Sequence, residues 1–503
     1  MARIAVIGAG MGAMAAAARL AVAGHRVTVY ERTETYGGAV RRVERDGFAF
    51  DTGPGLLPLP AVYRDLFVKT GKEALEDVVE LVQVDPAARH VFADGTEVSL
   101  PNASRAGVVA ALDEALGAGA GQRWGDFLGR ARETWDRTRR PLLEEPLWPD
   151  WRVLAEREPY PAVPHKRLLR TRRARTLREI GSWELRDERL AALLETQVLA
   201  YGLDPRTVPA SAAVLPYMEH AFGTWYVRGG MRELARAVYE RCVRRKVAFV
   251  FGAEVTRILR RDGRAAGVEL ADGTSAGADL VVADVDPVRL RALTERPLDE
   301  EGDVRAGTLS PPFARFTVLL ALRGAREAGA AHRTVVHAPD FESELDLLVA
   351  PGGERPGRPT VTVLRPDDPA LRPDDAHESV VLSAVMSPEV GWEDEAVVRH
   401  CADLLLEAAG SAVPGLRERL LWHEVRTPAH TQAETGAPLG VVPAPALAAG
   451  GGRFLHPANT TRLPGLYRVG GWSHPGGGLP HAGMSGALVA GLIVEGPEFR
   501  GSQ

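Results

Sequence analysis

The residues best suited to chemistry lie in a glycine-rich turn near the start of the chain. Gly8, Gly10 and Ala13 form the pattern G-x-G-x-x-A, and Glu31 follows downstream. A glycine at the first position permits a tight turn, and a glycine at the second lets the backbone approach a pyrophosphate. Ala13 still lets a helix pack closely on the preceding strand. This pattern predicts the binding of a dinucleotide.

A strand–turn–helix–strand unit must position these residues. The sequence predicts a strand at 3–7, a helix at 14–23 and a second strand at 26–30 that ends on Glu31. The helix N-terminus offers unpaired N–H groups to phosphates, and the Glu31 carboxylate suits a ribose. Glu31 would repel a 2'-phosphate, which argues against NADP. The alternative is a glycine turn that only joins a strand to a helix.

The following residues favour FAD over NAD. Gly37 and Gly38 provide a second close backbone approach, which suits a long cofactor that continues past the adenosine. The FAD-binding residues predicted in this first part of the chain are Gly8, Gly10, Met11, Gly12, Ala13, Glu31, Arg32, Gly37 and Gly38.

Composition and charge exclude several classes of protein. The chain has 503 residues, 45% hydrophobic and 25% charged, which is typical of soluble globular proteins and argues against disorder or a multi-pass membrane protein. The net charge is 61 minus 66, or -5, so no nucleic-acid partner is expected. The apolar run 4–18 is shorter than a bilayer requires. Cys242 and Cys401 are predicted to be buried thiols of a cytoplasmic protein, and no metal site is expected.

With the segment Phe50–Pro54 (FDTGP), these motifs resemble the carotenoid (phytoene) desaturase family. That family lies within a flavin superfamily that also contains monoamine oxidases and GDP-dissociation inhibitors. Two further blocks match, at 223–231 and 464–486. Ala39 stands where many superfamily members have Arg, and Val227–Arg228 replaces a Pro that often follows the tyrosine.

The resemblance implies further contacts with FAD. It places Val255 beside the adenine, and it implies that the C-terminal block closes over the pyrophosphate and the flavin ring, through Gly470, Gly471, Gly478 and Leu479.

Position alone suggests several other site residues. His474 and His481 flank a glycine run and are candidates for proton transfer, with packing or hydrogen bonding as the alternative. Trp225 and Tyr226 are candidates for a substrate channel, or else core residues. Asp51 is expected to brace its loop by hydrogen bonds.

The expected fold class is α/β (α+β), with two interleaved domains. A Rossmann-like FAD-binding domain is assembled from residues 1–75, 221–300 and 455–503. The mixed sheet-plus-helix substrate domain takes residues 76–220 and 301–454.

The resemblance implies an FAD-dependent oxidoreductase that desaturates an apolar polyene or isoprenoid-like substrate by hydride transfer to flavin N5. Alternatives are a flavin-dependent isomerase or saturase, an oxidase of another secondary metabolite, and a non-catalytic lipid-binding chaperone of the GDP-dissociation-inhibitor type. An amine oxidase is disfavoured because no Lys follows Lys246, whereas that branch often places one beside the flavin.

Two expectations concern partners. The chain contains a single dinucleotide fingerprint, so oxygen or a quinone is the expected electron acceptor. Residues 148–178 combine Trp148, Trp151 and Tyr160 with seven basic residues from Lys166 to Arg178. A solvated helix or rim of the substrate domain is the first interpretation of this stretch, and peripheral contact with an anionic membrane is the second.

Overall fold

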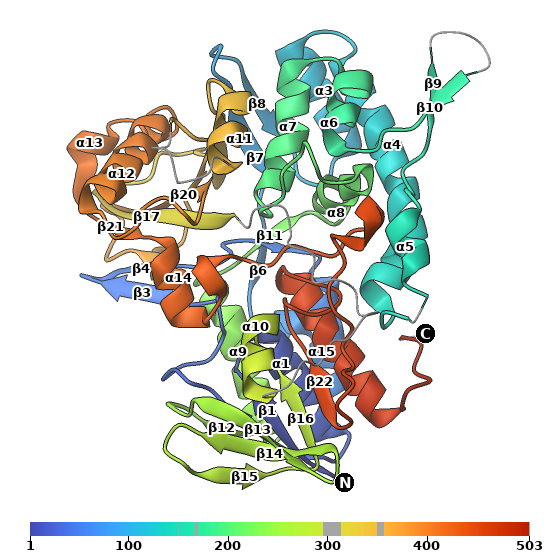
Figure 1. The fold of residues 1–503 in the computed structure, drawn as a ribbon. Helices are drawn as coiled ribbons and strands as arrows, with labels where there is room; N and C mark the ends of the chain where they lie inside the picture. The colour runs from blue at the N-terminus through green and yellow to red at the C-terminus, as the bar shows by residue number, and fades with distance from the viewer. Residues whose placement is uncertain (149, 166–169, 295–312, 350–356, 502–503) are drawn as a thin grey trace.

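The computed structural model describes residues 1–148, 150–165, 170–294, 313–349 and 357–501. In Figure 1 a parallel sheet with its helices occupies the lower part of the molecule. A second, larger sheet lies at the upper left, and a group of helices lies at the upper right.

The lower part is built on a five-stranded parallel sheet whose strands come from separate stretches of the chain. Its order is β12 (Ala248–Val250), β2 (Arg26–Tyr30), β1 (Arg3–Ile7), β16 (Leu280–Ala283) and β22 (Leu466–Arg468). In register, Ile4 lies opposite Val27 on one side and Leu280 on the other. The topology therefore brings the start, the middle and the end of the chain into one sheet.

Alternate residues of β1 face two different layers. Ile4 and Val6 pack against the helices that cover one face of the sheet. These helices are α1 (Met11–Val22), α2 (Ala61–Gly71), α9 (Met231–Arg244) and α15 (Leu479–Val494). Ala5 and Ile7 pack on the opposite face, against β13 (Val255–Arg261), β14 (Arg264–Leu270), β15 (Ser275–Gly277) and α10 (Pro287–Thr294). A parallel sheet covered on both faces explains why β1 is almost wholly apolar.

The upper sheet has seven strands and mixed directions. Its order is β21 (Leu420–Arg426), β17 (Ala314–Arg323), β20 (His377–Met386), β19 (Val361–Leu364), β18 (Arg333–Val336), β7 (Ala88–Val91) and β8 (Glu97–Leu100). One face packs on α12 (Glu395–Ala409) through residues such as Phe316, Val318 and Leu382. The opposite face borders the cavity described below.

A helical layer closes the upper right of the molecule. It includes α3 (Arg105–Leu116), α4 (Ala120–Arg139), α6 (Leu177–Ile180), α7 (Glu188–Leu199) and α8 (Val214–Phe222). Their apolar faces form one core around Phe127, Leu112 and Leu194. Small elements join the two parts, namely β3 (Arg42–Arg45), β4 (Phe48–Asp51), the antiparallel sheet β5 (Leu57–Pro58), β11 (Thr224–Val227) and β6 (Leu81–Gln83), and α14 (Pro428–Thr435).

The described residues in the first half of the basic stretch form a hairpin and not a helix. Val163–His165 (β9) and Arg170–Arg172 (β10) pair as an antiparallel hairpin, which corrects the expectation of a solvated helix. Alternating Arg and Thr residues suit an exposed two-stranded hairpin, in which successive side chains point to opposite faces. Lys166 and Arg167 lie outside the described residues.

The aromatic residues of this stretch do not project beside the hairpin. Tyr160 is fully buried and donates a hydrogen bond to Glu184 over 2.8 Å. The Trp148 ring lies under the Arg500 guanidinium, 3.6 Å from its ring centroid. Among the described members of the predicted membrane-binding pattern, Arg170, Arg173 and Arg175 are exposed, whereas no aromatic side chain is: Trp148 and Trp151 are half-buried and Tyr160 is buried.

The two cysteine thiols and the hydropathy of the helices are the remaining features of the fold. Cys242 and Cys401 are free and buried, as predicted. Among the described residues, no helix combines the length and apolar character that crossing a bilayer would need.

Candidate functional site

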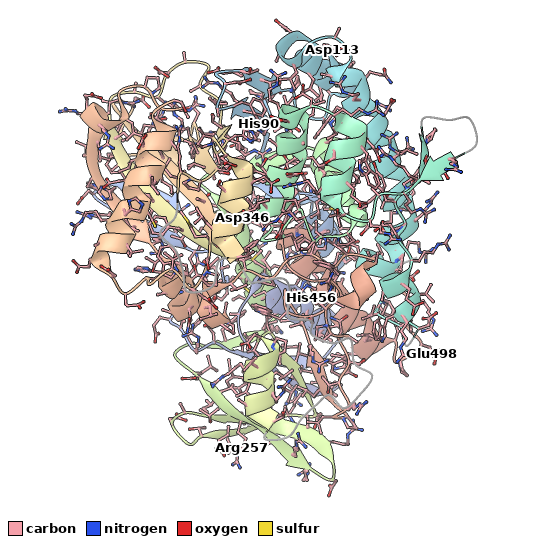
Figure 2. The ribbon with its side chains drawn as sticks, turned by 45° about the horizontal axis from the view of Figure 1, so that its top comes forward. His90, Asp113, Arg257, Asp346, His456 and Glu498 are labelled. Carbon is pink, nitrogen blue, oxygen red and sulfur yellow. The ribbon has the colours of Figure 1, made fainter. Side chains whose placement is uncertain are left out.

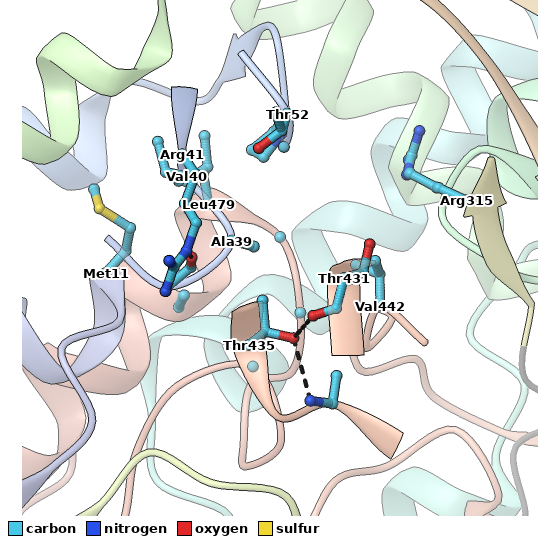
Figure 3. Close-up of a pocket in the computed structure, with 18 of the residues that line it drawn as sticks. Met11, Ala39, Val40, Arg41, Thr52, Arg315, Thr431, Thr435, Val442 and Leu479 are labelled. Carbon is cyan, nitrogen blue, oxygen red and sulfur yellow. Dashed lines mark hydrogen bonds between the residues drawn. The ribbon is translucent and has the colours of Figure 1, made fainter. Parts of the chain in front are cut away.

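A cavity of about 870 Å³ lies between the two sheets. It is bounded by the carboxyl ends of β1, β2 and β16 and by the exposed face of the seven-stranded sheet. Ligands of open α/β sheets bind at the carboxyl ends of their strands. Figure 3 shows Met11 and Arg41 on one side of this space and Arg315 on the other.

The sequence-predicted cofactor residues converge on one end of the cavity. Of the fourteen, all but Ala13 line it: Gly8, Gly10, Met11, Gly12, Glu31, Arg32, Gly37, Gly38, Val255, Gly470, Gly471, Gly478 and Leu479. Ala13 is fully buried inside α1, where its small side chain permits close packing.

Backbone, rather than side chains, forms most of this end, and we call Gly8, Gly10, Gly12, Gly38 and Gly470 the glycine wall. A Cβ on Gly10 would lie 2.3 Å from Asp284 Oδ2, and one on Gly12 would lie 2.8 Å from the Gly470 Cα. Gly470 also has a φ of +87°, which L side chains rarely adopt. No larger residue fits these positions without displacing its neighbours.

Helix α1 begins within the motif, three residues earlier than the sequence predicts. Gly10 is its N-cap and Met11 its first residue. The unpaired N–H groups of the first turn therefore open directly onto the cavity, where they suit phosphate oxygens.

Glu31 directly follows β2 and is held in place by three hydrogen bonds. Its carboxylate accepts from the Ala9 N–H at 2.8 Å, the Thr33 N–H at 2.9 Å and the Thr33 hydroxyl at 2.8 Å. A buried carboxylate with several donors is rigid. It therefore presents its oxygens to the cavity with little freedom to turn away.

The double glycine forms the second close approach. Gly37 makes a bridge to Gly10, and a Cβ on Gly38 would lie 3.1 Å from the Gly10 Cα. Arg41 donates to the Gly38 carbonyl over 2.9 Å and places a positive charge in the cavity wall. Arg32 lies farther out and donates to the Ala433 carbonyl.

The C-terminal block closes the same end. Gly478 is the N-cap of α15, and the Gly470 N–H donates to the Ser485 hydroxyl over 3.0 Å. The N-termini of α1 and α15 thus both meet the cavity. Two positive helix ends are a suitable environment for a pyrophosphate.

Asp284, at the carboxyl end of β16, is a cavity residue that sequence reasoning missed. Burial raises the pKa of its carboxyl group to about 7, partly offset by the Ala13 N–H that donates to it and reinforced by the nearby negative charge of Glu31. Its position after the strand 280–283 was the available signal, because polar residues at strand ends of a parallel sheet face the ligand.

Asp51 braces the loop, as expected. Its carboxylate accepts from the N–H groups of Met231 at 2.6 Å and Arg232 at 3.2 Å, at the start of α9. Burial raises the pKa of this carboxyl group to about 6.

The two aromatic candidates lie on opposite sides of β11. Tyr226 lines the cavity and donates to Asp368 over 2.7 Å. Trp225 is absent from the described lining, and its indole N–H donates to the Phe222 carbonyl. Adjacent strand residues point to opposite faces, so only one of the two could have met the cavity.

The two histidine candidates also lie in different places, one in the cavity lining and one outside it. His481 lines the cavity, and its Nδ1 is buried without a partner in the described structure. His474 is fully buried away from the lining, and its Nε2–H donates to the Glu145 carbonyl over 2.9 Å. Burial lowers the pKa of His474 to about 4 and that of His481 to about 3, with His456 a further cause for both. Both rings are therefore neutral at pH 7, and each keeps a single N–H, so neither is poised to act as a general acid.

Figure 2 places His456 near the C-terminal segment and His90 in the upper part of the molecule. His456 hydrogen bonds the Ala444 carbonyl over 2.7 Å, and His90 lies 3.0 Å from His337, from Nδ1 to Nε2. The buried histidines thus belong to two separate groups.

These residues fit FAD. The glycine wall leaves room for a pyrophosphate, and Glu31 faces a ribose position. Five buried polar atoms of the lining lack partners in the described structure, and Thr52 Oγ1 and His481 Nδ1 are two of them. Unsatisfied buried polar atoms are rare in proteins and are consistent with a ligand.

Comparison with known proteins identifies the family of the chain. The profile described as "flavin containing amine oxidoreductase" matches residues 14–494. A hydroxyneurosporene desaturase of Cereibacter sphaeroides is 31% identical, over 98% of this chain and 97% of its own. A 4,4'-diapolycopene oxygenase of Methylomonas sp is 29% identical, over 98% of each chain.

Solved structures share the fold at lower identity. An oxidoreductase from Methanosarcina mazei has a TM-score of 0.64 at 18% identity, over 97% of this chain and 99% of its own. A putrescine oxidase has a TM-score of 0.63 at 13% identity, over 98% and 99%. The chain therefore shares its fold with these two oxidoreductases.

Proposed function

The chain belongs to the flavin-containing amine oxidoreductase family, and we propose that it desaturates the apolar chain of a polyene. It is an FAD-dependent oxidoreductase. The observation that carries the proposal is the single cavity that runs from the glycine wall to the seven-stranded sheet, which lets an elongated substrate meet the cofactor. Relatives named as carotenoid desaturases align over nearly the whole chain.

The residues proposed to hold FAD act in three places. The glycine wall and the N-termini of α1 and α15 hold the pyrophosphate, Glu31 holds the adenosine ribose, and Val255 lies beside the adenine. Bound FAD supplies a flavin ring that accepts a hydride at N5.

The protein's own share is orientation and exclusion of water. Tyr226, fixed by Asp368, forms part of the wall along which the substrate chain lies. His481 is neutral and has its Nδ1 free, so we propose a polar contact with the bound cofactor in place of proton transfer.

Anaerobic mixing tests this proposal. Purified protein should be yellow, and its visible flavin band should bleach when a polyene is added without oxygen. The product should be lighter by two hydrogen atoms. Unchanged mass would favour an isomerase, a gain of two hydrogens a saturase, and added oxygen an oxidase of another metabolite. A colourless protein that FAD does not stabilise thermally would favour the chaperone alternative.

We further propose that oxygen or a quinone takes the electrons, because one dinucleotide fingerprint serves the whole chain. Reduced enzyme should be reoxidised by air or by a soluble quinone and not by NAD or NADP. Stopped-flow recovery of the flavin band measures this, and fast reoxidation by a nicotinamide would contradict it.

Peripheral contact with an anionic membrane remains our proposal for the exposed hairpin of β9 and β10. Arg170 and Arg173 are exposed there. The double change Arg170→Glu and Arg173→Glu should abolish sedimentation with phosphatidylserine vesicles, while phosphatidylcholine vesicles bind neither protein. Equal sedimentation of both proteins would contradict it.

A further inference from the structure

The face of the seven-stranded sheet that borders the cavity is mixed: it presents the apolar Val335, Leu364, Val381 and Val385, with polar side chains between them. In β17, Phe316 and Val318 pack on α12, whereas Arg315 and Thr317 line the cavity. The same alternation in the neighbouring strands places Ser383 of β20 and Thr362 of β19 in the lining. We call Arg315, Thr317, Ser383 and Thr362 the polar wall.

Three hydroxyl groups of the polar wall form a row across adjacent strands. Thr317 lies opposite Ser383 in the register of β17 and β20, and Ser383 lies opposite Thr362 in that of β20 and β19. Directly opposed residues of adjacent strands bring their side chains within about 5 Å of each other. Within the described residues, none of the three hydroxyls makes a hydrogen bond.

Arg315 stands beside this row, two residues before Thr317 on the same strand face. Its guanidinium donates to the Ala200 carbonyl, at the end of α7, and its side chain is exposed to the cavity. Figure 3 shows it on the opposite side of the cavity from Met11 and Arg41. It therefore lies away from the glycine wall.

Neighbouring arginines of the same sheet show what Arg315 lacks. Arg333 pairs with Glu219, and Arg426 pairs with Glu434. Arg315 has no carboxylate partner among the residues that the structure describes. The protein around Arg315 lowers the pKa of its guanidinium by partial desolvation, which Tyr201 offsets in part.

A pure hydrocarbon would leave this wall unsatisfied. Covering hydroxyl groups and a guanidinium with apolar atoms removes their water without replacing its hydrogen bonds, and each such loss costs free energy. A carboxylate would instead accept two hydrogen bonds from the guanidinium, and the hydroxyl row could donate to it as well.

We propose that the substrate is a polyene whose chain ends in a carboxylate, which binds Arg315 and the hydroxyl row. This specificity rests on the proposed desaturase function. It orients the chain with its charged end on the polar wall and its reacting carbons toward the glycine wall.

Binding to the holoenzyme tests the proposal. The probes are retinoic acid, compared with its methyl ester, and the dicarboxylic acid norbixin, compared with its dimethyl ester, because full esterification removes the charge and little else. Equilibrium dialysis gives Kd for each. Each acid should bind the native enzyme about 10- to 100-fold more tightly than its ester, the range expected for hydrogen bonds to a charged group.

Two variants and a control assign the effect to the wall. Arg315→Met should bring the affinity of the acids down to that of the esters. Thr317→Val, which keeps the side-chain shape, should lower it a few-fold. Arg323→Met should change nothing, because Arg323 lies on the same strand, outside the lining, and bonds the Glu418 carbonyl.

The outcomes separate this proposal from the proposed function. Equal binding of acid and ester by the native enzyme, no binding of either acid, or an unchanged ratio in both Arg315→Met and Thr317→Val, overturns the carboxylate site. If in those cases a hydrocarbon polyene still bleaches the flavin and loses two hydrogens, the desaturase function stands. If no polyene of any kind reduces the flavin, the proposed function itself fails.

Discussion

Around Gly10 and Gly470 the cavity is bounded by backbone, whereas around Arg315 and Thr317 it is bounded by side chains. The glycine wall excludes side chains by contacts as short as 1.9 Å, from a Gly470 Cβ to Asp284 Oδ1. The polar wall projects side chains from a regular sheet, and other side chains of similar size would leave the strands intact. The glycine wall therefore accepts only glycine at its positions, whereas a single substitution in the polar wall can change substrate binding and leave the strands intact.

The strongest test of this contrast is Gly10→Val. A branched side chain would fall on Asp284 and on the space of the pyrophosphate, so FAD retention should be lost. The ratio of flavin absorbance to protein absorbance measures this. Gly277→Val is the matched control, because a Cβ there meets nothing within 4 Å. Full occupancy in the Gly10 variant would show that the glycine wall does not hold FAD.

Glu31 tests whether a side chain of the cofactor end matters as much as its backbone. Glu31→Ala should weaken FAD by about 1 to 3 kcal/mol, for the loss of a charge-assisted hydrogen bond. Glu31→Gln keeps one carbonyl acceptor and should lose less. Titration of flavin-free protein with FAD gives both values, and an unchanged Kd in the alanine variant would remove Glu31 from the site.

The raised pKa of the Asp284 carboxyl group predicts that FAD binding depends on pH. With a pKa of about 7, its carboxyl group is neutral below that pH and charged above it, where it would repel the phosphates. FAD affinity should therefore fall as pH rises through about 7, by at most about tenfold per pH unit. Asp284→Asn should flatten the profile. A native profile as flat as that of the variant would contradict the assignment.

The smallest effects should come from β11. Tyr226→Phe removes a hydroxyl that faces the cavity and bonds Asp368, and it should raise KM a few-fold, or about 1 kcal/mol. Trp225→Phe removes an indole on the opposite side and should leave KM unchanged. Steady-state kinetics with one polyene measures both, and equal changes would mean that the strand alternation does not decide substrate contact.

Much of the cofactor end was accessible from the sequence because its constraints are local. A helix that starts at Met11, directly after a glycine turn, requires small residues at fixed spacing, and Glu31 follows at the end of the next strand. Eight of the thirteen predicted residues that line the cavity belong to this local segment, whereas the other five were implied only by the family resemblance: Val255, Gly470, Gly471, Gly478 and Leu479. The predictions for Trp225 and His474 had no such local constraint, and the structure places both away from the lining.

Residue types and their spacing were enough to identify the cofactor motif and the resemblance to the family. The side chains that face the glycine wall across the cavity depend on how the folded chain pairs its strands. Arg315, Thr317, Ser383 and Thr362 come from three strands, and their hydroxyl row exists because the sheet register sets Thr317 opposite Ser383 and Ser383 opposite Thr362. Strand pairing over such separations depends on the packing of the whole sheet on α12, which no local spacing encodes.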